Sequence, residues 1–170
     1  MKPYTCYLSL GANLGERGET LREALRSLAG LSGIHLVAVS PFYETAPWGK
    51  LDQPAFLNAA AAVETTLSPL ELLKGCQRIE QQLGRNHKTQ KKADGHAAIS
   101  YQDRTIDIDL LEAFQPKTDT DNAPITSIEQ SSSLQHYRPI TFHSEQLTLP
   151  HPLMHERDFV MQPLSELPHP

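Results

Sequence analysis

Apolar side chains recur every second residue in some stretches of the chain and every third or fourth in others, and this change of period marks the expected elements. On residues 4–11 apolar side chains take alternate positions, which predicts a strand that ends at Gly11. Residues 34–43 and 56–64 are rich in Val, Ala and aromatic side chains and predict two more strands, joined by a Pro- and Gly-containing loop at 44–55. Between the first two strands, apolar residues three and four apart predict a helix with one apolar stripe, formed by Leu21, Ala24, Leu25 and Leu28.

A second helix has clear start and stop signals. Ser68 and Glu71 have the spacing of a capping box, and Pro69 occupies the first helical position between them. Gly84 supplies a C-terminal stop. The apolar stripe of this helix is Leu72, Cys76, Ile79 and Leu83.

Residues 103–111 combine a strand pattern with two acidic side chains. Asp107 and Asp109 alternate with apolar residues, so both project from one face of the expected strand. Alternate strand residues lie roughly 7 Å apart, so two such carboxylates can converge on Mg²⁺ ions about 3.5–4 Å apart that hold a polyphosphate. Asp is disfavoured in strands, so a pair of them needs an explanation. The alternative to a metal site is that their face is solvated or that they pair with Arg104. These residues alone do not decide between the two.

The order of expected elements defines the fold class. With a short helix at 154–161, the chain follows the order β-α-β-β-α-β of a ferredoxin-like split βαβ, an α+β fold with an antiparallel sheet flanked by helices. The whole chain, 1–170, fits one domain. Two polar stretches, 86–102 and 115–136, have little to bury and are expected to be inserted, mobile loops.

Composition excludes several classes of protein. The formal charge of −5 argues against a nucleic-acid-binding protein, which relies on a broad basic face. Two cysteines, Cys6 and Cys76, in apolar patterns indicate buried free thiols rather than a disulfide framework. No apolar run approaches the roughly 20 residues that span a bilayer, so we expect no membrane association and a cytoplasmic protein. Residues 11–15 lack the Lys-Ser/Thr of a Walker-type loop, which excludes a P-loop kinase.

Six segments of the chain match one known pattern in the same order. They are residues 7–15, 40–49, 53–60, 78–85, the Asp107 and Asp109 pair, and 147–152 with Met154, Arg157 and Phe159. In these segments the chain resembles the 6-hydroxymethyl-7,8-dihydropterin pyrophosphokinase family of the folate pathway. The resemblance implies a monomeric enzyme that transfers diphosphate from ATP to the hydroxymethyl group of a reduced pterin, releases AMP and uses two Mg²⁺ ions held by the Asp pair.

The resemblance also assigns residues to the pterin. Phe56 and Phe159 match a stacking pair, and Asn58 matches an amide that recognises the pterin edge. The alternative for each Phe is ordinary core packing. Asn58 lies within an apolar run, where an unpartnered buried polar group costs about 1–3 kcal/mol, and this favours a ligand role. Backbone contacts from the 44–55 loop are implied for Thr45, Ala46 and Trp48, although relatives often have Pro where this chain has Ala46.

Further positions match residues that contact ATP or the transferred phosphates in relatives. The implied ATP contacts are Gln77, Glu80, Leu110, Thr148, His151 and Arg157. Arg85 and Arg104 match basic residues of mobile active-site loops and join the Asp pair as catalytic candidates, since a guanidinium suits phosphate. The chain departs from many relatives at three positions, where it has His87, Tyr101 and Gln146. A replacement cation could come from Lys88, Lys91 or Lys92, which could equally form a solvated charge run.

Two other functions remain open at this stage. One is a catalytically inactive, ligand-binding descendant of the same fold, because fold alone does not give function. The other is an ordinary kinase that transfers one phosphoryl group. Because only the resemblance chooses attack at the β-phosphorus, separation of AMP, ADP and ATP after reaction discriminates among the three.

Overall fold

The structure is a computed structural model that describes residues 1–45, 55–85, 105–118 and 136–170. Its main sheet has the strand order β2-β4-β1-β5-β6, with β3 also paired to β4, and a second, two-stranded sheet is formed by β7 and β8. The elements in chain order are β1 (Tyr4–Ala12), α1 (Arg17–Gly30), β2 (Ile34–Val39), β3 (Tyr43–Thr45), β4 (Phe56–Thr65), α2 (Pro69–Arg85), β5 (Asp107–Pro116), β6 (Tyr137–Pro139), β7 (Phe142–His143), β8 (Thr148–Leu149), the 3₁₀ helix η3 (Met154–Glu156) and α3 (Asp158–Ser165).

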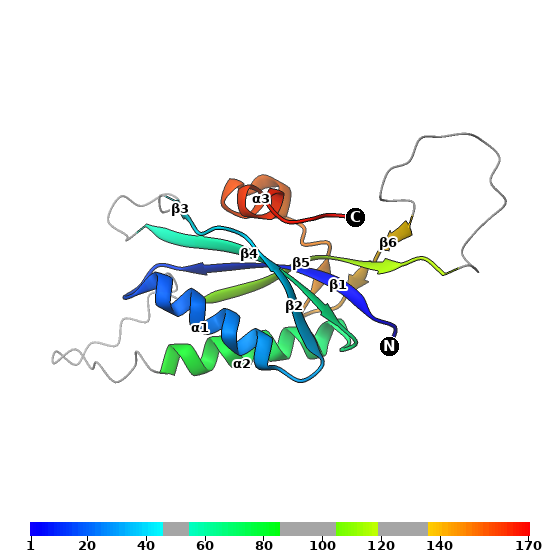
Figure 1. Cartoon of the computed structure of the whole chain (residues 1–170), viewed down its shortest axis with the longest axis horizontal. Helices are drawn as coiled ribbons and strands as arrows, with labels where there is room; N and C mark the ends of the chain where they lie inside the picture. Colours follow the sequence, from blue (N-terminus) through cyan, green and yellow to red (C-terminus); the bar gives the residue numbers. More distant parts are fainter. Residues whose placement is uncertain (46–54, 86–104, 119–135) are drawn as a thin grey trace.

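The arrangement confirms the expected α+β class. The four central strands β2-β4-β1-β5 are antiparallel to their neighbours, which is the order that two interleaved βαβ units produce. Helices α1 and α2 cover one face of this open sheet, and α3 lies on the opposite face (Figure 1). Among the described residues, no helix is long and apolar enough to cross a membrane.

Strand β1 lies at the centre of two apolar layers. Its alternate residues from Tyr4 to Ala12 face α1 and α2, where they pack with the buried stripes of both helices, including Leu21 and Leu72. Tyr7 faces the other way and packs with α3. The alternation of β1 therefore supplies both layers, as the period-2 pattern predicts.

The start of α2 confirms the expected capping box. The Glu71 N–H donates to Ser68 Oγ at 3.3 Å, and the Ser68 N–H donates to Glu71 Oε2 at 2.8 Å. All four residues of the apolar stripe are buried: Leu72, Cys76, Ile79 and Leu83. The expected stop at Gly84 is wrong, since α2 continues through Arg85.

Two expected elements are each divided into two. The strand expected at 34–43 ends at Val39 and resumes as β3, because Ser40 exchanges hydrogen bonds with the backbone of Ala60 through both its N–H and its hydroxyl, and Pro41 has no N–H to continue the ladder. The helix expected at 154–161 is η3 followed by α3, separated by Arg157 in an extended conformation.

The expected loop at 115–136 begins too early. Gln115 and Pro116 belong to β5 and pair with Arg138 and Tyr137 of β6, because the two strands form an antiparallel ladder. Residues 119–135 of that stretch lie outside the described residues, as do 86–102, so the expected mobility of both segments stays a prediction. Strand β5 begins at Asp107 rather than at 103 and runs to Pro116.

Candidate active site

The sheet brings an amide, a glycine and a carboxylate into one row. Gly11 on β1 pairs with Asn58 on β4 and with Asp107 on β5. Two residues further along both strands, on the same face, Ser9 pairs with Asp109. Because cross-strand partners and alternate residues share a face, these side chains lie on the face that carries α3.

The two carboxylates have the environment that the sequence pattern predicts. Asp107 and Asp109 are half-buried, whereas the alternating apolar residues are buried on the other face: Ile106, Ile108 and Leu110. In the described ranges no group of three or more His, Cys, Asp or Glu side chains could hold a metal ion. Carboxylate oxygens are the ligands that a hard cation prefers, so the two Asp side chains could contribute to such a site.

A pocket of about 260 Å³ opens beside Asp109. Three of the residues assigned to ATP line it, namely Leu110, Thr148 and His151. Its other walls come from α2, through Leu73, and from the turn between β7 and β8 with the following proline: Ser144, Glu145, Gln146, Leu147 and Pro152. The pocket thus joins one carboxylate of the pair to part of the implied nucleotide site.

His151 is oriented by backbone contacts. Its N–H donates to the Leu111 carbonyl oxygen, and its Nδ1 accepts a hydrogen bond from the Leu153 N–H at 3.2 Å. Burial lowers the pKa of His151 below its usual value, nearby Arg157 lowers it further, and Asp107 acts in the opposite direction. The neutral ring therefore holds its proton on Nε2, where it is available to donate to a ligand.

The Asn58 amide lies deep in the sheet and has a partner within the protein. Asn58 is buried, and its Nδ2 donates to the Thr45 hydroxyl at 2.6 Å. The sequence-based inference that only a ligand could supply a partner for Asn58 is therefore wrong. The amide still has a second N–H and a carbonyl oxygen for other contacts. A Cβ at Gly11 would lie 3.0 Å from Asn58 Oδ1 and 3.9 Å from Phe56 Cδ1, so glycine keeps this space open.

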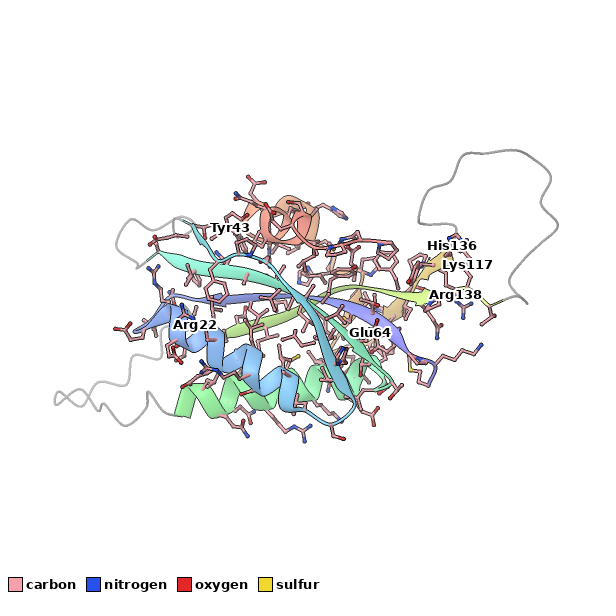
Figure 2. The ribbon with its side chains drawn as sticks, in the orientation of Figure 1. Arg22, Tyr43, Glu64, Lys117, His136 and Arg138 are labelled. Atoms are coloured by element: carbon pink, nitrogen blue, oxygen red, sulfur yellow. The ribbon has the colours of Figure 1, made fainter. Side chains whose placement is uncertain are left out.

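Phe159 lies on α3, half-buried against the apolar layer on the same face. The Arg157 guanidinium lies 5.8 Å from the centre of its ring, within the range of a cation–π contact. Helix α3 is joined to the sheet by the Tyr43 hydroxyl, which donates to Glu166 Oε1 at 2.8 Å. Figure 2 shows Tyr43 on the side of the sheet toward this helix.

The other candidates are less closely grouped. Gln77 is exposed on α2, one turn after Leu73, and lines a separate pocket of about 530 Å³. Glu80 is half-buried on α2. The pKa of Cys76 is raised to about 12, mainly by burial, then by the charge of Glu80 and to a smaller extent by that of Asp109. Arg85 is the last residue of α2. Several candidates lie outside the described residues: Ala46, Trp48, His87, Lys88, Lys91, Lys92, Tyr101 and Arg104.

Sequence reasoning missed Gly11, Ser9 and Leu73 as neighbours of the site. A usable signal existed for Gly11, because glycine at the end of a strand pattern often marks a close approach of another group. β1 continues through Ala12, so this glycine lies within the strand. For Ser9 and Leu73 the pattern predicted only a strand and a helix position.

Comparison with known proteins finds matches over nearly the whole chain. The family model described as 7,8-dihydro-6-hydroxymethylpterin-pyrophosphokinase (HPPK) matches residues 7–169. Proteins named 2-amino-4-hydroxy-6-hydroxymethyldihydropteridine pyrophosphokinase are 41% identical over 162 residues in Porphyromonas gingivalis and 36% identical over 163 residues in Haemophilus influenzae. These alignments cover 95% and 96% of this chain and 88% and 81% of the relatives.

A longer relative matches the same region. The folic acid synthesis protein fol1 of Schizosaccharomyces pombe is 37% identical over 161 residues, which is 95% of this chain but 17% of that protein. The chain therefore corresponds to one part of that longer protein.

Proposed function

The chain belongs to the 7,8-dihydro-6-hydroxymethylpterin-pyrophosphokinase family, and on that premise we propose that its reaction takes place around the Asp pair. Its activity is the transfer of diphosphate from ATP to the hydroxymethyl group of the pterin, a step of folate biosynthesis. The observation that supports this location is the strand register, which puts Asn58, Gly11 and Asp107 in one row beside the pocket that Asp109 lines.

We assign Mg²⁺ to the Asp pair. The donor set suits this ion, because two carboxylates on alternate residues of one strand offer hard oxygen ligands and leave positions for water and phosphate oxygens. Asp107 and Asp109 would hold two ions, which when bound would offset the negative charge of the polyphosphate. The contribution of the protein is to fix both carboxylates on β5, which pairs with β1 at these two residues.

ATP is the co-substrate, and we propose that it occupies the pocket beside Asp109. Leu110 and Thr148 line this pocket, and His151 would donate from Nε2 to a phosphate oxygen. Arg157, whose charge already acts on His151, would face the same phosphates. Gln77 and Glu80 on α2 complete the proposed ATP contacts, and Arg85 and Arg104 are the proposed cations on the transferred group.

The pterin would lie toward Asn58. Phe159 on α3 and Phe56 on β4 are the proposed stacking residues, since a flat bicycle suits two aromatic rings. Asn58 would use its remaining N–H and its oxygen on the amide-like edge of the pterin. Thr45, Ala46 and Trp48 are proposed as the remaining contacts.

In the reaction the pterin hydroxyl oxygen forms a bond to the β-phosphorus of ATP. The bond between this phosphorus and the oxygen bridging to the α-phosphate breaks, AMP leaves with that oxygen, and the hydroxyl proton is released to the solvent. Such transfer relies mainly on positioning and charge neutralisation, so it needs the two substrates aligned in line with the leaving oxygen. We further propose that the protein acts as a cytoplasmic monomer.

The deciding experiment incubates the protein with ATP, 6-hydroxymethyl-7,8-dihydropterin and Mg²⁺ and separates the nucleotides. AMP and pterin diphosphate should form in equal amounts, and a chelator should stop the reaction. Stoichiometric ADP would indicate single phosphoryl transfer, and binding of both substrates without turnover would indicate an inactive descendant.

A further inference from the structure

We propose that Arg17, the first residue of α1, is a positioning residue for the pterin side of the active site. The inference rests on the proposed function, because it assumes that the pterin lies beside Thr45, Phe56 and Asn58. Arg17 contacts Glu44 and Ala55, the chain neighbours of Thr45 and Phe56, rather than the substrate itself.

The Arg17 guanidinium links α1 to β3 and to the residue that precedes β4. Its Nη1 donates to the Ala55 carbonyl oxygen at 2.5 Å, and its Nη2 donates to Glu44 Oε1 at 3.1 Å. Glu44 is the middle residue of β3, and Ala55 immediately precedes β4. One planar, two-pronged donor therefore holds both strands at once, which a lysine ammonium does not reproduce with the same geometry.

These contacts flank the end of the β3–β4 ladder. Thr45 pairs with Phe56 as the last pair of that ladder, next to Glu44 and Ala55 in the chain. Since β3 has three residues, its ladder is short and opens easily unless side chains reinforce it. The Thr45 hydroxyl in turn accepts the Asn58 hydrogen bond, so opening of this pair would also release the amide.

The two contacts of Arg17 differ in weight. The side chain of Glu44 is 62% exposed, so its ion pair with Arg17 contributes little. The bond to the Ala55 carbonyl is partly buried and is donated by a charged group, which makes it the stronger contact. The hydrogen bond from Arg17 to Ala55 should therefore account for most of the effect of Arg17 on pterin binding.

The position of Arg17 also opposes a general preference of helices. A cation at a helix N-terminus faces the positive end of the helix dipole, where acidic residues are favoured. The other two arginines of α1, Arg22 and Arg26, lie further along the helix, where both contact Glu19. The unfavourable placement of Arg17 is explained by its contacts to β3 and the start of β4, because local rules are broken most often where function requires it.

The test compares Arg17→Gln with Arg26→Gln, which removes another arginine of α1 whose ion pair with Glu19 is exposed. Arg17→Gln should raise the KM for the pterin about tenfold, as expected for loss of one charge-assisted hydrogen bond, with the KM for ATP changed by less than about twofold. Arg17→Lys should have an intermediate effect, and Glu44→Gln a small one. Arg26→Gln should match the wild type in both constants.

Calorimetry with the pterin, in the presence of Mg²⁺ and a non-hydrolysable ATP analogue, should show the same selective loss. The proposal is overturned if Arg17→Gln behaves like Arg26→Gln, or if it raises both KM values equally together with a lower melting temperature. Should Arg17→Gln not fold, Arg17→Lys decides by the same ratio of KM values. Failure of the wild type to form AMP would instead overturn the proposed function.

Discussion

At the scale of single residues, the Asp pair combines opposite requirements. Asp107 and Asp109 lie on β5, where the neighbouring residues Ile106, Ile108 and Leu110 are buried, yet both Asp residues stay partly accessible. The pairing of β5 with β1 holds the two residues in place, and their accessibility leaves room for a cation and its other ligands.

Asp107→Asn and Asp109→Asn should each lower turnover by at least about 10²-fold, because each removes a ligand charge from the proposed metal site. Glu112→Gln is the matched control, since Glu112 lies on the same strand but pairs with His169. Steady-state assays over a range of Mg²⁺ concentrations provide the measurement. Near wild-type activity of either Asp variant, with an unchanged Mg²⁺ requirement, would show that the metal site lies elsewhere.

Phe159→Ala and Asn58→Ala should weaken pterin binding about tenfold or more, since stacking and one buried amide contact are each worth about 1–3 kcal/mol. Binding of an ATP analogue should change far less. Phe114→Ala is the control, because this ring packs in the same apolar layer against Tyr7 and His169. Calorimetry with both ligands would contradict the assignment if the loss were confined to the nucleotide.

His151 should make stability depend on pH in a defined direction. Its lowered pKa means that the folded state disfavours protonation, so its contribution is present above the ordinary histidine pKa of about 6.5 and is lost as pH falls toward the lowered value. Thermal melts between about pH 7.5 and 5.5 should therefore show a larger loss for the wild type than for His151→Gln. Parallel curves would mean that protonation of this ring is not coupled to folding.

At the scale of elements, α2 links the capping box to the nucleotide pocket. Its N-terminus is closed by Ser68 and Glu71, its buried stripe packs under the sheet, and Leu73 reaches the pocket. The bonds from Ser68 also hold the pKa of the Glu71 carboxyl below its usual range. The cap stabilises this helix from the end remote from Arg85, so its loss should act on folding rather than on catalysis.

Ser68→Ala should lower the free energy of unfolding by about 0.5–2 kcal/mol through loss of the N-cap. Both KM values should stay unchanged. Ser165→Ala is the comparison, because it removes an exposed hydroxyl near the end of α3 that bonds to the Gln162 carbonyl. Urea denaturation measures both variants, and a comparable loss in the two would show that the box adds nothing beyond a surface hydroxyl.

At the scale of the whole molecule, the two apolar layers have different consequences for the site. The layer under α1 and α2 supports the sheet from below, whereas the other layer docks α3 with Phe159 (Figure 1). The segment after α3 strengthens this docking. Tyr7 donates to the Pro168 carbonyl, and the His169 ring stacks on Tyr7 with centroids 4.1 Å apart while its Nε2 contacts Glu112.

Leu164→Ala and Leu28→Ala should each destabilise the protein by about 2–5 kcal/mol, since both side chains are fully buried. Only Leu164→Ala should also weaken pterin binding, because Leu164 holds α3 on the sheet and Phe159 lies on that helix. Unfolding and calorimetry on the same samples test this. Equal pterin affinities in the two variants would mean that the docking of α3 does not position Phe159.

The sequence alone determined features that depend on neighbours in the chain. The strand at the start, both long helices, the capping box and the single-face placement of Asp107 and Asp109 all follow from short-range period and residue type. The order of elements with the six matching segments also led to the fold class and the family. Boundaries were less certain, as the division at Ser40 and Pro41 and the continuation of α2 past Gly84 show.

Only the tertiary structure decided which distant residues are neighbours. The row of Asn58, Gly11 and Asp107 depends on the register of three strands, and the bond from Asn58 to Thr45 spans 13 positions of the chain. Likewise, the orientation of His151 depends on the Leu111 carbonyl, and the contact of Arg17 depends on the Ala55 carbonyl, both of which lie far away in the chain. The physical reason is that the period of a sequence determines the face on which a side chain lies, whereas packing and strand pairing determine what lies beside it.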